Sequence, residues 1–164
     1  MILKQINGHL RINFKARDWC KLPYPNHPRG CPNYGNRYSC PPEATLITEF
    51  IDIYKPMYLI AVEFDLANHI SRMKHLHPNW SDRQARCVLY WQNKINKELR
   101  DECDNFKWLN PDMITTNCPE AMGVNVIATA KRCGLMIELK PKNRVYKIAI
   151  AGYPIKEFKE CKVK

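Results

Sequence analysis

A chain of 164 residues, 45% of them apolar and four of them tryptophan, has enough hydrophobic side chains to bury a core, which excludes an intrinsically disordered protein. No apolar run approaches the roughly 18 residues of a membrane-spanning helix, and the first residues lack the apolar segment of a signal peptide, so we expect a cytoplasmic protein without membrane association. In a reducing cytoplasm the eight cysteines are expected to be metal ligands or small apolar side chains rather than disulfides.

The net charge of +10 is concentrated at the two ends of the chain. Residues 1–40 carry +6 and residues 131–164 carry +7, while residues 41–130 carry −3. Two basic ends that meet in space would form a patch that attracts nucleic acid, a nucleotide or another anionic partner. A basic surface that is merely solvated is the alternative.

The first half of the chain predicts two strands and two helices around a long loop. Alternation of apolar and polar side chains predicts a strand over residues 9–14. Pro41, Pro42 and Glu43 are typical of a first helical turn, and apolar residues then recur at helical spacing up to Tyr54. Residues 57–64 form an apolar run of strand length, and residues 66–76 predict a second helix.

The second half predicts two further helices and a hairpin. Ser81 with Gln84 forms a capping-box pattern that begins the longest helix, residues 82–108. Residues 111–117 are expected to be a connection, and residues 118–133 a helix followed by Gly134. The predicted strands 135–139 and 145–150 complete an α+β fold, a small mixed sheet with packed helices. We expect a single domain over residues 1–164, with an irregular basic tail at 153–164.

A proline-rich segment, residues 20–43, contains three of the cysteines and cannot be a helix interior or a central strand. A loop of this length inside a domain needs something to hold it, and Cys20, Cys31 and Cys40 acting on one metal centre are the obvious candidates. A fourth ligand must come from elsewhere. Cys118 is the best donor because it stands where a helix is predicted to begin, and His27 is the next.

The choice between zinc and an iron–sulfur cluster depends on spacing and on proline. Zinc ribbons bring close C-x2-C pairs, and this chain has none. Cys31, Cys40 and Cys118 are each followed by proline, as in the cluster-binding motifs of ferredoxins. The sequence therefore predicts a cluster, with a 4Fe-4S type favoured, on Cys20, Cys31, Cys40 and Cys118, and keeps zinc as the alternative.

The remaining polar candidates have plainer interpretations. The other cysteines are expected to be ordinary small side chains: Cys87, Cys103, Cys133 and Cys161. Glu120 is either a general acid or base beside the centre or the acidic residue that a first helical turn prefers. Three histidines are expected to be surface residues rather than a second metal site: His69, His75 and His77. No catalytic residue is indicated.

Two blocks of the sequence resemble a family of predicted metal-binding proteins, the domain family DUF2284. CPNYGNRYSCPP, at residues 31–42, is similar to the family's C-x-x-YG-x-x-x-x-CPP signature. EAMGVNV, at residues 120–126, with the following TA and GL pairs, is similar to its EA-x-G-I-D-V block. The resemblance covers most of the chain and implies metal binding, with iron–sulfur favoured, but no reaction.

This chain departs from the family pattern at three places. Relatives carry a further cysteine group before the second block, where this chain has LNPDMITTN. Cys118 stands where the family has serine, and Asn125 where it has aspartate. The resemblance therefore implies a short version with one centre, in which Cys118 is a replacement ligand.

Two function classes follow. The first is an iron–sulfur protein with a redox or sulfur-transfer role on an anionic substrate. The second is a basic nucleic-acid-binding module held together by zinc, without catalysis, whose binding would depend on salt. A small structural subunit is the third reading.

Overall fold

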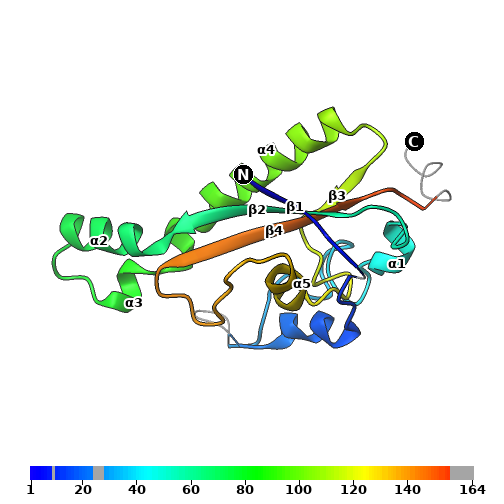
Figure 1. The fold of residues 1–164 in the computed structure, drawn as a ribbon. Helices are drawn as coiled ribbons and strands as arrows, with labels where there is room; N and C mark the ends of the chain where they lie inside the picture. The colour runs from blue at the N-terminus through cyan, green and yellow to red at the C-terminus, as the bar shows by residue number, and fades with distance from the viewer. Residues whose placement is uncertain (9, 24–27, 156–164) are drawn as a thin grey trace.

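A computed structural model describes residues 1–8, 10–23 and 28–155. Its centre is a four-stranded sheet in the order β1-β2-β4-β3 (Figure 1). The four strands are β1 (Ile2–Gln5), β2 (Tyr58–Asp65), β3 (Ile114–Thr116) and β4 (Arg144–Gly152). β2 and β4 pair over their length, from Tyr58 opposite Ala151 to Asp65 opposite Arg144. All three pairings are antiparallel, so the α+β class is confirmed with an antiparallel rather than a mixed sheet.

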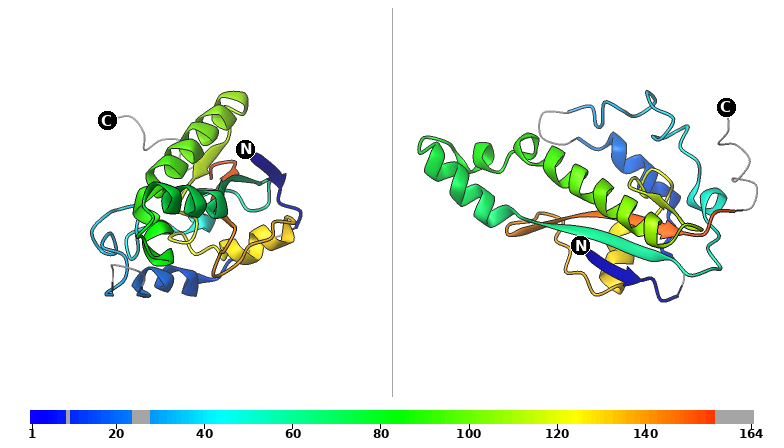
Figure 2. Two further views of the ribbon diagram at one scale, coloured as in Figure 1. Left: turned by 90° about the vertical axis from the view of Figure 1, so that its left-hand side faces the viewer. Right: turned by 90° about the horizontal axis from the view of Figure 1, so that it is seen from above.

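Both faces of the sheet are buried because side chains alternate along the two inner strands. One face carries Leu59 and Ile150 and packs against α1 (Ile47–Phe50) and α5 (Val126–Arg132). The other face carries Ile60 and Ala149 and packs against α4 (Gln92–Leu109). Helix α4 buries four residues on one side: Ile95, Leu99, Cys103 and Phe106. The two helical layers therefore lie on opposite sides of the sheet (Figure 2).

Three short elements extend beyond one end of the sheet. They are α2 (Leu66–Leu76), α3 (Asp82–Ala85) and the 3-10 helix η2 (Val88–Tyr90). Figures 1 and 2 show α2 projecting away from the segment that carries the cysteines. No helix within the described ranges is long and apolar enough to cross a membrane.

The N-terminal third forms a layer below the face that α5 covers. It contains the 3-10 helix η1 (Phe14–Lys21) and the turns and bends of residues 28–46. Backbone bonds attach this layer to residues 122 and 123: the Asn13 N–H donates to the Gly123 carbonyl at 2.8 Å, and the Ile47 N–H to the Met122 carbonyl at 2.9 Å. The layer places the loop beside the chain that leaves β3.

The strand predictions are partly confirmed. The predicted strands 57–64 and 145–150 correspond to β2 and β4. Residues 9–14 were expected to be a strand, but among their described members only Ile12 makes a bridge, to Val124. The predicted hairpin is wrong because residues 135–139 form no strand, and β4 pairs with β2 and β3 instead. The connection expected at 111–117 contains strand β3.

The helix predictions differ mainly in length. Helix 66–76 is confirmed as α2, and the Ser81–Gln84 capping box is present. The long helix expected over 82–108 is divided into α3, η2 and α4. The helix expected after Pro42 is reduced to the single turn of α1, because Ile51 is extended and bridges to Pro154. Of the predicted tail, residues 156–164 lie outside the described residues.

Candidate metal centre

Close backbone contact brings Cys20 beside Cys31. The Cys31 N–H donates to the Cys20 carbonyl at 2.7 Å, across the ten residues that separate them. Gly30 permits this approach, with a φ of +84° and a position at which an added Cβ would lie 2.5 Å from the same carbonyl oxygen. A side chain at residue 30 would therefore force the two cysteine segments apart.

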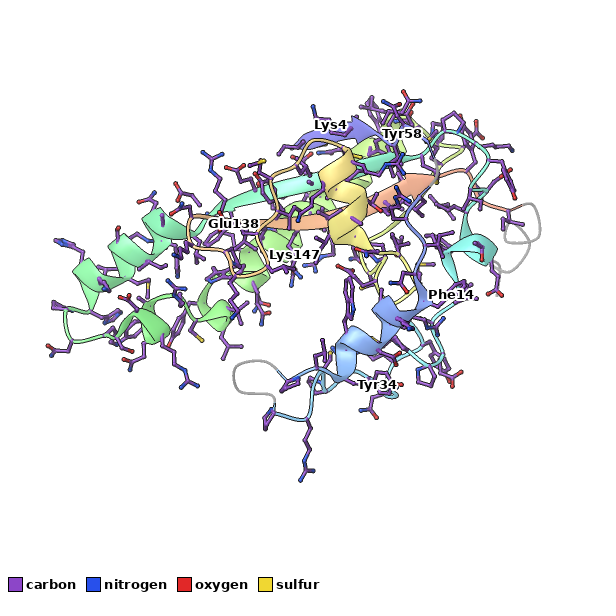
Figure 3. The ribbon with its side chains drawn as sticks, turned by 60° about the horizontal axis from the view of Figure 1, so that its bottom comes forward. Lys4, Phe14, Tyr34, Tyr58, Glu138 and Lys147 are labelled. Atoms are coloured by element: carbon purple, nitrogen blue, oxygen red, sulfur yellow. The ribbon has the colours of Figure 1, made fainter. Side chains whose placement is uncertain are left out.

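Side chains of η1 attach the rest of the loop. The Arg17 guanidinium donates to the Pro42 carbonyl at 2.6 Å, two residues after Cys40. The Lys21 ammonium lies 5.3 Å from the centre of the Tyr34 ring and forms an ion pair with Asp18 at 2.8 Å. Figure 3 shows Phe14 and Tyr34 on this layer. The loop is therefore fixed to the helix that carries its first cysteine.

Cys118 lies on a turn between β3 and α5. Its N–H donates to Thr116 Oγ1 at 3.3 Å, and the Ala121 N–H donates to the Cys118 carbonyl at 3.0 Å. The helix expected to begin here begins at Val126, with Asn125 as its N-cap. The sequence argument that a helix N-terminus favours the Cys118 thiolate is therefore wrong, since the helix begins eight residues later.

The four predicted ligands lie near enough to one another for their charges to interact. Burial raises the pKa of the Cys20 thiol, and Cys31, Cys40 and Cys118 raise it further because neighbouring negative charges disfavour a thiolate. Burial also raises the pKa of Cys118, and Glu120, Cys40 and Cys31 add to this effect. The three loop cysteines are half-buried and Cys118 is exposed at the surface. The Cys20 thiol thus senses the other three cysteines of the set, and the Cys118 thiol senses two of them, Cys40 and Cys31.

Two charged residues accompany the thiols. Glu120 is half-buried, and burial raises the pKa of its carboxyl group, while its own backbone N–H and Lys147 act in the opposite direction. Lys147 lies on β4 and also lowers the pKa of Cys118 (Figure 3). Lys147 was not among the site residues predicted from the sequence. The only signal was a lysine within the apolar run of residues 145–150.

The four thiols do not form a ready-made site for a single metal ion. In the part of the chain that the structure describes, no three histidine, cysteine, aspartate or glutamate side chains form a ready-made site for one metal ion. The other possible ligand that sequence analysis named, His27, lies outside the described residues.

The remaining cysteines and histidines lie elsewhere. Cys103 is buried in α4 as expected, and Cys87 and Cys133 are half-buried, while Cys161 lies outside the described residues. His69 was expected at the surface but is 6% exposed, and its Nε2 has no hydrogen-bond partner among the described residues. Its ring lies 5.4 Å from that of Phe64, so the residue belongs to the packing between α2 and the sheet.

A shallow pocket of about 240 Å³ adjoins Cys118. No aspartate, glutamate, lysine or arginine lines it, and its polar residues are Tyr38, Ser39, Thr45, Thr115, Thr116, Asn117 and Cys118. Ser39 directly precedes Cys40, and Asn117 directly precedes Cys118. The pocket therefore extends from the segment of Cys40 to that of Cys118. A small molecule in this pocket would therefore contact the only exposed thiol of the cluster.

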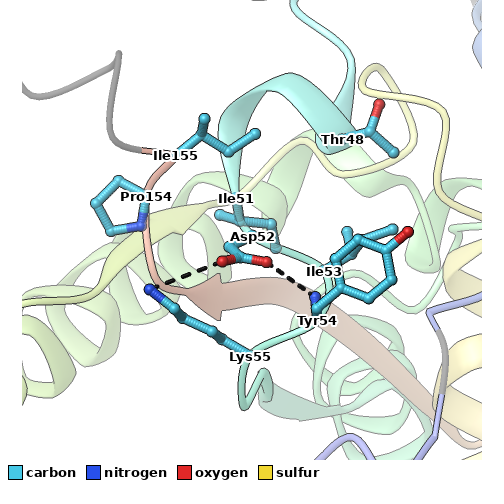
Figure 4. Close-up of a pocket in the computed structure, with 8 residues that line it drawn as sticks. All are labelled: Thr48, Ile51, Asp52, Ile53, Tyr54, Lys55, Pro154 and Ile155. Carbon is cyan, nitrogen blue, oxygen red and sulfur yellow. Dashed lines mark hydrogen bonds and ion pairs between the residues drawn. The ribbon is translucent and has the colours of Figure 1, made fainter.

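A larger cavity of about 440 Å³ lies near α1 and the end of β4 (Figure 4). Its charged groups already satisfy one another. Asp52 forms an ion pair with Lys55 at 3.7 Å and accepts the Tyr54 N–H at 3.1 Å. It holds no cysteine or histidine, so the thiol cluster is the better candidate for chemistry.

Comparison with protein-family models, with curated proteins and with solved structures finds no match to this chain, so the resemblance to DUF2284 stays a prediction.

Proposed function

We propose that this protein is an iron–sulfur protein in which Cys20, Cys31, Cys40 and Cys118 hold one cluster. The observation that supports the proposal is that the Cys20 thiol lies within electrostatic range of three other cysteines, one of which, Cys118, comes from a distant part of the chain. Cysteines with no chemical role gain nothing from this proximity, because each disfavours the thiolate of its neighbours. A bound metal centre supplies the missing reason, since it stabilises thiolates outright.

A cluster suits this arrangement better than a single zinc ion. Zinc draws four sulfurs to about 2.3 Å around one point. In a cluster each thiolate binds a different iron, so the sulfurs stand farther apart. The absence of a C-x2-C pair from the sequence and the proline after Cys31, Cys40 and Cys118 support the cluster. Binding would release the thiol protons, and Lys147 would offset part of the resulting negative charge.

The proposed role is redox chemistry at the Cys118 side. Cys118 is exposed and lines the uncharged pocket, whereas the three loop cysteines are half-buried. The iron bound by Cys118 would therefore be the one nearest to a partner or substrate. Glu120 stands beside that thiol and is suited to hold or release a proton as the charge of the centre changes. Exchange of one electron with an anionic partner is the simplest activity that these features support.

The test is anaerobic purification followed by iron and sulfide analysis and a visible absorption spectrum. Iron and sulfide in equal amounts, with the broad absorption of a cluster, are expected. Cys118→Ala should lower the iron content and change the spectrum, while Cys87→Ala, a half-buried cysteine outside the set, should not. One zinc per chain would instead support a zinc-held binding module. A chain that takes up no metal after reconstitution would refute both proposals.

A further inference from the structure

Three aromatic rings form a stack on the projecting part of the molecule. The rings of His77 and Trp80 lie 4.1 Å apart at an angle of 13°, and those of Trp80 and Tyr90 lie 5.1 Å apart at 26°. His77 follows α2, Trp80 precedes α3, and Tyr90 ends η2. Tyr90 is 55% exposed and His77 is exposed, so the stack is a surface feature and not a core.

Local hydrogen bonds hold this stack in place without a ligand. The Trp80 N–H donates to the His77 carbonyl at 2.9 Å. Ser81 and Gln84 close a capping box at the start of α3, and Lys74 of α2 forms an ion pair with Asp82 of α3. A preformed array of rings loses little conformational entropy when a planar ligand stacks on it.

The surface around the stack is basic. Residues 66–90 contain four lysines and arginines and a single acid, Asp82. Lys74 already engages that acid. Arg83 and Arg86 are exposed, three residues apart, and within the described ranges neither guanidinium has a hydrogen-bond or ion-pair partner. Two exposed cations thus lie close in sequence to the stack, and one of them, Arg86, also acts on the charge of Asp82.

We propose that the His77–Trp80–Tyr90 stack and the neighbouring Arg83 and Arg86 bind single-stranded nucleic acid. Single-strand binding sites combine aromatic rings, on which bases stack, with cations that follow the phosphate backbone. An acidic protein would satisfy the arginines but need not present a flat group beside each charge, whereas every nucleotide carries both a base and a phosphate. The proposal is independent of the proposed metal centre, because α2 projects away from the segment that carries Cys20, Cys31 and Cys40 (Figure 1).

The probe is a fluorescein-labelled oligouridine RNA of roughly 12 nucleotides. Its binding is measured by fluorescence anisotropy at about 100 mM salt. Tyr90→Ala should weaken binding about tenfold, the loss of one stacked base. Tyr90→Phe keeps the ring and should leave binding unchanged. Trp108→Ala is the matched control, because Trp108 is 83% exposed on α4, away from the stack.

The arginines are tested by charge reversal. Arg83→Glu with Arg86→Glu should weaken binding and flatten the dependence on salt, and Arg100→Glu on α4 is the control. Circular dichroism establishes that each variant is folded. Equal losses in Tyr90→Ala and Trp108→Ala would overturn the proposal, as would equal affinity for duplex RNA, in which bases are not free to stack. Competition by polyglutamate as effective as that by the RNA would assign the surface to acidic proteins instead. Iron content should be the same in all these variants.

Discussion

Replacing Gly30 by alanine should separate Cys20 from Cys31. The added Cβ would lie 2.5 Å from the Cys20 carbonyl oxygen, whereas ordinary contact begins at 3.4 Å, so the carbonyl must retreat by about 0.9 Å. That movement lengthens the 2.7 Å bond from the Cys31 N–H beyond hydrogen-bonding range. The thiols at both ends of this contact then lose their fixed spacing.

The expected cost has two parts. A non-glycine residue in the left-handed region costs about 1–2 kcal/mol, and the lost hydrogen bond adds about 0.5–1.5 kcal/mol. Gly35 provides a matched control, because its φ is also positive, at +70°, but nothing lies within 4 Å of an added Cβ. Gly35→Ala should therefore show the backbone strain alone. The difference between the two variants isolates the close approach at residue 30.

Two measurements separate stability from metal binding. Urea unfolding of the metal-free chain should show Gly30→Ala about 1 kcal/mol less stable than Gly35→Ala. After anaerobic reconstitution, iron per chain should fall sharply in Gly30→Ala and stay near that of the parent in Gly35→Ala. Equal iron content in the two variants would refute the argument that this contact sets the geometry of the centre.

Three further substitutions test the core, a helix cap and the buried carboxyl group. Leu99→Ala on α4, where the side chain is 2% exposed, should cost about 2–5 kcal/mol in urea unfolding, whereas Trp108→Ala should stay within about 0.5 kcal/mol. Asn125→Ala removes the 3.0 Å bond from the Ala128 N–H at the start of α5 and should cost about 1 kcal/mol by the same assay. Because burial raises the pKa of Glu120, the folded metal-free chain keeps this proton to a higher pH than the unfolded chain, and the resulting stability is lost as pH rises from about 4.3 through the folded-state pKa. Glu120→Gln cannot ionise and should flatten this part of the thermal-unfolding profile; an unchanged profile would count against a buried carboxyl group.

The fold was predictable where one local signal was strong. The apolar run that became β2 and the capping box at Ser81 each specify their element without help from distant residues. Predictions from the sequence were wrong where contacts with distant parts of the chain determine the secondary structure. β3 has only three residues and forms because it pairs with β4, so its own sequence shows no pattern that predicts a strand. Residues 135–139 have the composition of a strand, but β4, the strand that they were expected to pair with, pairs with β2 and β3 instead.

The candidate site was predictable by chemical type but not by position. Cysteine and proline indicated the loop, and the lack of a fourth loop cysteine led to Cys118. The reason given for Cys118 was wrong, because the turn at residues 118–123 replaces the expected helix. Lys147 and the burial of Glu120 depend on how β4 passes the turn, which local patterns do not encode.

The order of strands in the sheet has a consequence for synthesis on the ribosome. Of the four strands in the described part of the chain, β4 is made last, yet it occupies an interior position between β2 and β3. Until it emerges, β2 has a bare edge on one side and β3 has nothing to pair with. The turn that carries Cys118 continues directly from β3, so it reaches the three loop cysteines only after β4 has joined the sheet. A nascent chain would thus leave these thiols without their final arrangement until residues 144–152 have left the ribosome, and assembly of any metal centre becomes a step that follows closure of the sheet.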